Sequence, residues 1–339
     1  MKVLHVTECY AGGVSRAMNT LAAIYEGEHH LLWAGEDSPP GAFVSSQRLP
    51  DGLLERVRSV RRAVATIQPD LVHAHSSWAG VYTRLLPIGV PVAYEPHCFV
   101  FDDPKRPTYL RAAYWAAESA LSVNTNVTIA LTPHEAKLAK RLRPLNRVRE
   151  LPNVATVDLS LARSAGGGTG SERYTVSMVG RVARQKDPEY FAEVALAAKR
   201  AGASWRFVWI GDGNDAASRI VLANAGVEIT GWLDGAELVE TLQRSDMYLH
   251  SASYEGFPLS VLDAAALSIP IIVRDVACFE GFDLMKASTP EDATRRIRTV
   301  ATSLEVRRDL TEKSRALTAR MSVEAQRAGL DAIYREAIA

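Results

Sequence analysis

Residues 246–275 read DMYLHSASYEGFPLSVLDAAALSIPIIVRD, in which two runs typical of buried β-strands, DMYLHSA and IPIIVRD, enclose one helical stretch. The first run ends in a loop, Glu255-Gly256-Phe257-Pro258. We expect Pro258 to be the first residue of the helix, where its missing N–H costs nothing. A strand, a helix and a second strand in succession indicate two parallel strands, because parallel strands need a long crossover connection.

The same alternation runs through the whole chain. The first half contains the strand-like runs KVLHVT, HHLLWAG, DLVHAHS, VPVAYEPH, VTIALT and VRELPN, and the second half adds YTVSMVG, WRFVWIG and VEITGW. Amphipathic stretches lie between these runs. The sequence therefore predicts an α/β protein with two Rossmann-like parallel sheets covered by helices on both faces.

The length of 339 residues is more than one hydrophobic core usually serves. A Gly- and Ser-rich stretch, SLARSAGGGTGS at 160–171, offers little to bury and predicts a linker at 159–172. We therefore expect an N-terminal domain at 1–158, a C-terminal domain at 173–320 and a last helix at 321–339 that crosses back to the N-terminal domain. Two such domains would face a cleft, which is a preferred place for ligands.

Composition excludes several classes of function. Lys+Arg and Asp+Glu balance at 39 each, so nothing points to nucleic acid as a partner. Cys9, Cys98 and Cys278 are isolated and suggest neither a disulfide framework nor a zinc site. The first residues do not form a signal-peptide core and no apolar run reaches membrane-spanning length, so a cytoplasmic location is expected. The oligomeric state is left open.

The loop and helix at 255–263 suggest an anion site. The uncapped N–H groups at a helix start attract a diphosphate, and Gly256 allows the backbone to come close to it. Glu255 and Asp263 bring two carboxylates near this site, which suggests a ligand with several hydroxyl groups. The alternative is that Glu255 caps the helix and that Asp263 lies on a solvated helix face; spacing does not decide between the two.

This segment resembles the E-x7-E motif of glycosyltransferase family 4 (glycosyl transferases group 1), which belongs to the retaining GT-B enzymes. Further matches follow the order of that family in both halves of the chain. They are Gly12-Gly13 with Arg16, His97 in YEPHCF, Gly180-Arg181 with Lys186, Gly211-Asp212-Gly213, Thr230-Gly231, Glu237-Leu238 and Ser245-Asp246. The match is strong in the C-terminal half and weaker in the N-terminal half.

The resemblance implies a GT-B fold and a role for each matching residue. Arg181 and Lys186 would bind the donor diphosphate and stabilise its departing charge, Glu255 would contact hydroxyls of the transferred sugar, and His97 would lie beside that sugar. Asp263 would contact the ribose. The residues that the resemblance places around the donor are Gly12, Gly13, Gly180, Gly211, Thr230, Gly256, Phe257, Pro258, Leu259 and Asp263. No metal ligand is among them.

Each of these residues also has a purely structural interpretation. Arg181 and Lys186 would be surface cations, His97 a histidine held by hydrogen bonds, and Gly12-Gly13 a tight turn. The sequence also departs from the family in two places. The second acidic residue is Asp263 rather than Glu, one methylene shorter, and the stretch 277–281 lacks the glycine pair that many members carry.

Basic residues cluster in two expected helices of the N-terminal half. They are Arg56, Arg58, Arg61 and Arg62 in the first cluster and Lys137, Lys140, Arg141, Arg143, Arg147 and Arg149 in the second. One interpretation is peripheral contact with an anionic membrane on its inner face, and the other is a solvated helix surface.

Together these features predict a retaining, metal-independent glycosyltransferase. Its donor would be a UDP- or GDP-linked sugar, used as a co-substrate with no further cofactor, and its acceptor a glycan, a lipid-linked glycan or a small molecule. Two alternatives remain at this stage. One is an epimerase or hydrolase of nucleotide sugars on the same fold, and the other is a catalytically silent protein that binds them.

Overall fold

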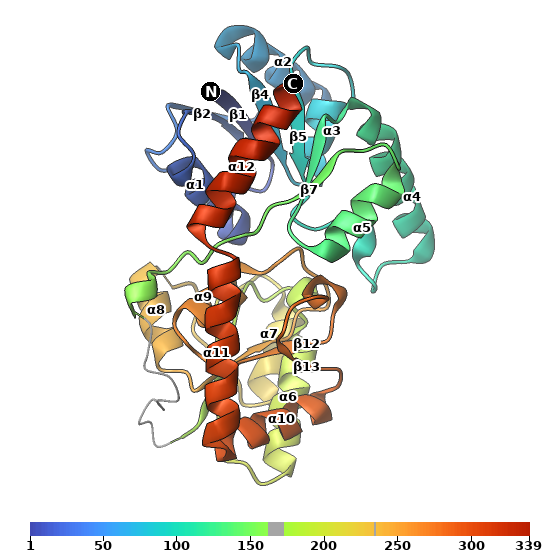
Figure 1. The fold of residues 1–339 in the computed structure, drawn as a ribbon. Coiled ribbons are helices and arrows are strands. Elements are labelled where there is room, and N and C mark those ends of the chain that lie inside the picture. Colours follow the sequence, from blue (N-terminus) through green and yellow to red (C-terminus); the bar gives the residue numbers. More distant parts are fainter. Residues whose placement is uncertain (162–172, 234) are drawn as a thin grey trace. The chain divides into compact units, whose positions relative to one another are not determined.

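The computed structural model describes residues 1–161, 173–233 and 235–339, and the chain forms two compact units. Unit 1 comprises Met1–Val154 and Ser322–Ala339, and unit 2 comprises Ala155–Met321 (Figure 1). The first boundary falls four residues before the expected linker. Most of that linker, residues 162–172, lies outside the described residues.

Unit 1 is built on a seven-stranded, fully parallel sheet in the order β3-β2-β1-β4-β5-β6-β7. Its strands are β1 Lys2–Thr7, β2 Glu28–Trp33, β3 Ser45–Arg48, β4 Leu71–His75, β5 Val92–Glu95, β6 Val127–Ala130 and β7 Val148–Glu150. Its helices are α1 Gly12–Ile24, α2 Leu53–Ile67, α3 Ser77–Arg84, α4 Thr108–Leu121, α5 Pro133–Leu142 and α12 Val323–Ile338.

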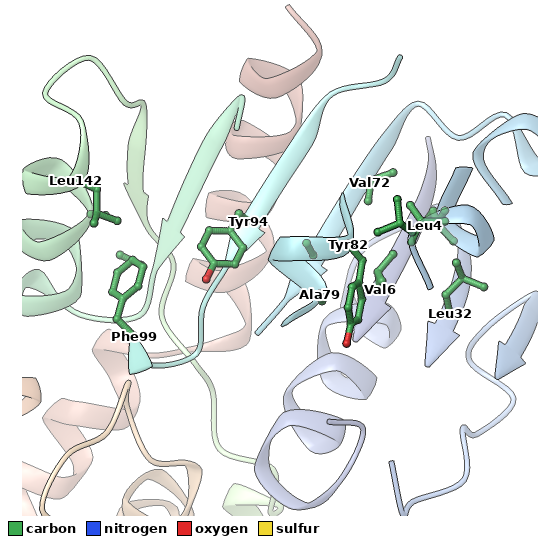
Figure 2. Packing of buried hydrophobic residues seen from close by; sticks show 14 of the residues in the cluster. Leu4, Val6, Leu32, Val72, Ala79, Tyr82, Tyr94, Phe99 and Leu142 are labelled. Atoms are coloured by element: carbon green, nitrogen blue, oxygen red, sulfur yellow. The ribbon is translucent and has the colours of Figure 1, made fainter. Parts of the chain in front are cut away.

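One face of this sheet carries an apolar core with side chains from α2, α3 and α5. Figure 2 shows part of it, with Leu4 and Val6 of β1 and Val72 of β4 beside Tyr82 of α3. Because successive side chains of a strand point to opposite faces, Val3, Leu71 and Ala93 belong to the other face.

The C-terminal helix α12 is part of that second face. Leu330, Ile333 and Tyr334 of α12 are buried against Leu71 and Ala93 of the sheet and belong to the same apolar cluster as Tyr25, which follows α1. Tyr334 is fully buried and its hydroxyl lies 2.8 Å from Nδ1 of His73. The last helix is therefore an integral layer of unit 1.

Unit 2 repeats the architecture with six parallel strands in the order β10-β9-β8-β11-β12-β13. The strands are β8 Thr175–Val179, β9 Arg206–Ile210, β10 Glu228–Ile229, β11 Met247–His250, β12 Ile271–Arg274 and β13 Met285–Ala287. The helices are α6 Pro188–Arg200, α7 Ala216–Asn224, α8 Gly235–Gln243, α9 Leu259–Ala266, α10 Pro290–Thr302 and α11 Leu304–Arg320. Both predicted parallel sheets are confirmed.

Two strands and one helix start differ from the expectation. Both missed strands, β3 and β13, lie at sheet edges, and β3 has the fully exposed sequence SSQR, which carries no apolar alternation to predict a strand. The expectation for Pro258 was wrong by one residue. It has extended backbone angles (φ −73°, ψ 125°) and precedes α9, which begins at Leu259.

In each sheet the strand order reverses once along the chain. The reversal lies between β1 and β4 in unit 1 and between β8 and β11 in unit 2. The loops after the carboxyl ends of these two neighbouring strands run to opposite faces of the sheet. The crevice between such loops is where ligands bind in parallel α/β proteins. The segments after β8 and β11 are the ones that hold most of the predicted donor-site residues.

We predict that Tyr334→Ala destabilises the protein by about 3–5 kcal/mol, because it leaves a cavity under α12 and removes the partner of His73. Ile338→Ala serves as the control on the same helix, since Ile338 is 45% exposed, and should cost less than about 0.5 kcal/mol. Urea unfolding followed by circular dichroism measures both. Equal midpoints for the two variants would show that α12 does not support the fold.

Candidate active site

The loops after β8 and β11 are joined by several hydrogen bonds within unit 2. The backbone N–H of Ser253 donates to the carbonyl of Gln185 at 2.9 Å, and the hydroxyl of Ser251 donates to the carbonyl of Lys186 at 2.7 Å. The two loops thus form one surface at the point where the strand order reverses.

On this surface the ammonium of Lys186 binds the carboxylate of Glu255 directly. Their side chains are 19% and 10% exposed. Burial raises the pKa of Glu255, but Lys186 and His250 more than offset this effect and the pKa falls to about 2. Glu255 is therefore an anion at neutral pH. The structural interpretations of Lys186 as a free surface cation and of Glu255 as a helix cap were wrong.

Glu255 is also held from the side of the sheet. Nε2 of the buried His250 lies 3.6 Å from its carboxylate, and Nδ1 of His250 lies 3.1 Å from the hydroxyl of Tyr248, which donates to Ser260 at 2.8 Å. Sequence analysis missed His250 and Tyr248. The signal was present in β11, where YLH places two polar-tipped residues on one face of a buried strand.

The glycines of unit 2 permit close backbone contacts. A Cβ on Gly211 would lie 2.3 Å from the carbonyl oxygen of Gly180, and a Cβ on Gly180 would press on the side chain of Lys186 at 3.1 Å. The hydroxyl of Thr230 accepts from the N–H of Gly211 at 3.3 Å and donates to the carbonyl of Gly231 at 2.8 Å. Gly180 and Gly211 thus shape the crevice through their backbones, and Thr230 does so through its hydroxyl.

The helix start after Glu255 could contact a ligand only through its backbone. Among the described residues no side chain caps α9, and Gly256 is a buried residue beside it. Phe257 is buried against Phe279 and Phe282, and Leu259 is 7% exposed. Any donor contact of Phe257 and Leu259 is therefore confined to their main chains.

Asp263 is fully buried, so the expectation of a solvated helix face was wrong. Its Oδ1 accepts from the backbone N–H of Thr156 at 2.7 Å and from the Thr156 hydroxyl at 3.0 Å. The side chain of Asp263, which is shorter than that of Glu, therefore connects α9 to the segment that follows β7. The contact with a ribose therefore stays a prediction.

In unit 1, Gly12 begins α1 with a φ of +56°, which favours glycine, and its N–H donates to Asp37 at 2.9 Å. The hydroxyl of Ser15 also donates to Asp37. The carboxylate of Asp37 therefore already binds the start of α1. No atom of the described residues lies within 4 Å of the place where a Cβ on Gly13 would stand.

His97 follows β5 in the left-handed region, with a φ of +58°. Nε2 of His97 lies 3.1 Å from Nδ1 of His75, and Nδ1 of His97 lies 3.3 Å from Oε1 of Glu95. Both ring nitrogens therefore face partners inside unit 1, in agreement with the structural interpretation of this residue.

The histidines around His97 were not singled out by sequence analysis. Two overlapping sets, His5 with His73 and His75 and then His75 with Glu95 and His97, bring potential metal-ligand atoms within 4.8 Å of one another. The signal was the HAH of β4, whose two histidines share a face with Glu95 of β5. The ring nitrogens of His5, His75 and His97 already bond to one another, so a metal ion would have to replace those bonds.

Arg181 completes the arrangement in unit 2. It is exposed, immediately follows Gly180, and has no hydrogen bond or ion pair in the part of the chain that the structure describes. The surface thus combines one unengaged guanidinium, one ammonium paired with a carboxylate and one helix start. Such a set suits an anionic ligand that also carries hydroxyl groups.

Two family models match the chain. Residues 6–154 match the family described as "Glycosyl transferase 4-like domain", and residues 173–303 match "Glycosyl transferases group 1". The two matches lie in unit 1 and unit 2, respectively, and together they span most of the sequence.

Three curated relatives illustrate the breadth of the similarity. The chain is 26% identical over 299 residues to an uncharacterized 41.2 kDa protein of the cps region of Klebsiella pneumoniae, with 82% of each protein covered. It is 28% identical to the Escherichia coli UDP-Gal:alpha-D-GlcNAc-diphosphoundecaprenol alpha-1,3-galactosyltransferase, covering 61% of this chain and 58% of that protein. It is 25% identical to the GDP-mannose-dependent alpha-mannosyltransferase of Mycobacterium tuberculosis, covering 81% and 79%.

Solved structures share the fold. Sucrose-phosphate synthase from Thermosynechococcus elongatus superposes with a TM-score of 0.81 at 16% identity, with 98% of each chain covered. WaaG, a glycosyltransferase involved in lipopolysaccharide biosynthesis, superposes with a TM-score of 0.75 at 16% identity, covering 98% of this chain and 99% of that one. These superpositions confirm the expected GT-B fold.

We predict that the Lys186–Glu255 pair stabilises the protein only above acidic pH. The pKa of Glu255 falls from 4.5 to about 2 on folding, so its contribution is complete above about pH 4.5 and disappears as the pH falls towards 2. Glu255→Gln should therefore lower the free energy of unfolding at pH 7, by about 1–3 kcal/mol, and the difference from the native protein should shrink on acidification.

The matched control is Glu240→Gln, because Glu240 pairs with Arg244 on an exposed helix face, with side chains 62% and 70% exposed. We expect an effect below about 1 kcal/mol there. Urea midpoints between pH 7 and the lowest pH at which both proteins fold provide the measurement. A difference between Glu255→Gln and the native protein that stays constant with pH would contradict the assigned charge state.

Proposed function

This chain belongs to the glycosyl transferases group 1 family and is a nucleotide-sugar-dependent glycosyltransferase, and from this premise we propose how its residues divide the work. Unit 2 binds the nucleotide-sugar donor and unit 1 binds the acceptor. The sugar is transferred with retention of configuration and without a metal ion. The observation that carries this proposal is the Lys186–Glu255 pair beside Arg181 at the strand-order reversal of unit 2.

The proposed role of these cations follows from the charge that develops in the reaction. When the bond between the sugar and the diphosphate breaks, negative charge grows on the leaving phosphate. Arg181 and Lys186 stabilise that charge more in the transition state than in the bound donor, which lowers the barrier. The helix start at Leu259 adds backbone N–H groups to the same anion site.

Glu255 has two tasks in this proposal. In the ligand-free protein it neutralises Lys186, so that a buried ammonium is not left unpaired. When a donor is bound, Lys186 donates some of its hydrogen bonds to the diphosphate. The second carboxylate oxygen of Glu255 then accepts from hydroxyls of the sugar. His250 keeps the carboxylate in place through its contact with Oε1.

The donor and the acceptor are proposed as classes. The E. coli relative is named for UDP-Gal and a diphosphoundecaprenol acceptor, and the M. tuberculosis relative is named for GDP-mannose. We propose a UDP- or GDP-linked hexose as donor and a glycan acceptor that is lipid-linked. Three alternatives on the same fold differ from this proposal in the product formed. They are an epimerase, a hydrolase and a silent binding protein.

We predict that incubation with a panel of UDP-, GDP- and ADP-sugars and lipid-linked glycan acceptors releases free nucleoside diphosphate together with an extended glycan. Arg181→Ala and Lys186→Ala should each lower kcat by about 10²–10³-fold, the usual cost of removing one fixed group that stabilises a developing charge. Arg308→Ala, which removes an exposed arginine of α11, is the control and should keep the native rate.

Near-native rates of the Arg181 and Lys186 variants would contradict their role. Mass analysis of the products separates the reactions, because hydrolysis gives free sugar and epimerisation gives a changed nucleotide sugar without diphosphate release.

Contact of unit 1 with an anionic membrane is the second part of the proposal. Lys137, Lys140 and Arg141 of α5 are exposed. Tyr109 and Trp115 of α4 are exposed too, and aromatic residues of this kind are enriched at membrane interfaces. Arg147 and Arg149 bind Glu336, and Arg56 binds Tyr82. Across residues 1–161, 173–233 and 235–339, every helix is too short or too polar to cross a membrane.

We predict that the protein sediments with anionic liposomes at low salt. Replacement of Lys137, Lys140 and Arg141 by Gln should weaken this binding by about 10²-fold, because each cation contributes about 1 kcal/mol near such a surface. Replacement of the exposed Lys199, Arg308 and Arg315 of unit 2 is the matched control. Binding that is insensitive to salt, or equal with zwitterionic liposomes, would rule out the electrostatic contact.

A further inference from the structure

Trp78 is an exposed tryptophan at the strand-order reversal of unit 1. It lies in the first turn of α3, which follows β4, and β4 is one of the two strands at that reversal. Trp78 is 53% exposed, although tryptophan is highly buried on average in folded proteins. A large aromatic ring that is open to solvent at the place where parallel α/β proteins bind their ligands points to a ligand of its own.

The ring of Trp78 is supported by Tyr82, one turn further along α3. The two ring centres are 6.4 Å apart and the ring planes differ by 23°. Tyr82 is itself buried, and its hydroxyl accepts from the guanidinium of Arg56 at 2.8 Å. Nε of Arg56 donates to the carbonyl of Pro50, also at 2.8 Å. The indole therefore packs against a fixed partner, which lowers the entropy cost of binding a ligand against it.

Glu8 reaches the same place from β1, the other strand at the reversal. Its Oε2 accepts from the hydroxyl of Ser76 and from the backbone N–H of Ala79, so the carboxylate lies beside the start of α3. Burial raises the pKa of the Tyr82 hydroxyl, Arg56 lowers it, and the nearby charge of Glu8 raises it again. Because a carboxylate offers about four acceptor positions, Glu8 can accept further hydrogen bonds from a ligand.

An open aromatic face beside a carboxylate matches the chemistry of a pyranose. One face of a pyranose ring presents C–H groups, which pack against the electron-rich face of an indole. The hydroxyl groups stand around the rim of the sugar ring, where a carboxylate accepts from them. An ionised Glu8 would also repel phosphate, which disfavours a nucleotide or an anionic lipid headgroup at this place.

We propose that Trp78 and Glu8 form a subsite of unit 1 for an uncharged pyranose of the acceptor, with the sugar ring against the indole and its hydroxyls bound to the carboxylate. This inference rests on the proposed function, which assigns the acceptor to unit 1. Tyr82 is a positioning residue that holds the indole. Each strand-order reversal then carries one glutamate for sugar hydroxyls, Glu255 for the donor and Glu8 for the acceptor.

The test is the indole N–H resonance of Trp78 in ¹H–¹⁵N spectra of the full-length protein, which has six tryptophans. Its loss in Trp78→Phe assigns the resonance. The probes are the methyl α-pyranosides of glucose, galactose, mannose and N-acetylglucosamine, added alone and together with UDP or GDP. We expect at least one of them to shift the Trp78 resonance to saturation. A resonance that responds to none of these sugars, with or without nucleotide, would overturn the proposal.

Substitutions of Trp78 measure what the indole contributes, with sugar binding read from saturation-transfer spectra of the responding pyranoside. Trp78→Ala should weaken binding by about tenfold, because it removes the aromatic face, and Trp78→Phe should lose less, because it keeps a smaller one. Leu86→Ala is the matched control, since Leu86 is 51% exposed just beyond the other end of α3, and should bind as the native protein does. Native affinity in Trp78→Ala would contradict the subsite.

Substitutions of Glu8 test the hydrogen bonds to the sugar hydroxyls. Glu8→Ala should weaken sugar binding by about tenfold, because it removes the acceptor. Glu8→Gln keeps one carbonyl acceptor and should bind more tightly than Glu8→Ala. If Glu8→Ala does not fold, because it also leaves Ser76 and Ala79 without their partner, the comparison of Glu8→Gln with the native protein still decides. Equal affinity of all the folded Glu8 variants would remove Glu8 from the subsite.

Calorimetric titration with UDP and GDP separates this inference from the proposed function. Nucleotide binding should be native in Trp78→Ala, because the donor belongs to unit 2. Sugar binding that survives Trp78→Ala in a protein that binds nucleotide refutes the subsite alone, whereas a native protein that binds no nucleotide refutes the donor site and leaves the sugar result standing. A Trp78 resonance that shifts with UDP or GDP alone, or with phosphatidylglycerol vesicles but no sugar, would show another occupant and overturn the proposal.

Discussion

The pairing of β8 with β11 is the constraint on which the candidate site depends. These strands are 67 residues or more apart in sequence, yet their parallel pairing makes their carboxyl ends neighbours and gathers the two following loops at one place. Lys186 and Glu255 meet only because of that register. Since the buried carboxylate and ammonium neutralise each other, the same contact that prepares the site also joins the two loops.

Buried charge in this protein is compensated locally wherever it holds a loop in position. Asp187, in the left-handed conformation at the start of α6, accepts from Tyr190 and binds Arg274, whose guanidinium lies 4.5 Å from the Tyr190 ring centre. Asp263 accepts two hydrogen bonds from Thr156. The removal of either partner from such a contact would leave an unpaired polar group in the core, which is costly.

The fold could be predicted from the sequence because the β-branched runs alternate with helical stretches, and that alternation is a local property. β3 and β13 were missed because edge strands need not be apolar. Lys186 and Glu255 could be predicted only through a family resemblance, since the contact between them is set by sheet register. The contact of Asp263 with Thr156 could not be predicted because the two residues are 107 positions apart in the sequence. The hydrogen bonds that join His5, His75 and His97 were missed for the same reason, because these residues lie far apart in the sequence.

The two strand-order reversals use a carboxylate in opposite ways. In unit 1, Glu8 follows β1 and accepts from the hydroxyl of Ser76 and the backbone N–H of Ala79, both neutral donors. Burial therefore dominates and raises the pKa of Glu8. In unit 2, Glu255 faces Lys186 and remains ionised down to about pH 2.

This difference matches the division of labour proposed for the two units. A crevice that holds a fixed cation and a fixed anion suits a diphosphate with an attached sugar, because charge groups already in place need no reorganisation when the ligand arrives. At the reversal of unit 1, the Glu8 carboxylate accepts from a hydroxyl and a backbone N–H, which is compatible with the uncharged hydroxyl acceptor proposed for that unit. The two units share one topology. They differ in the partners of the glutamate that lies at each reversal of strand order.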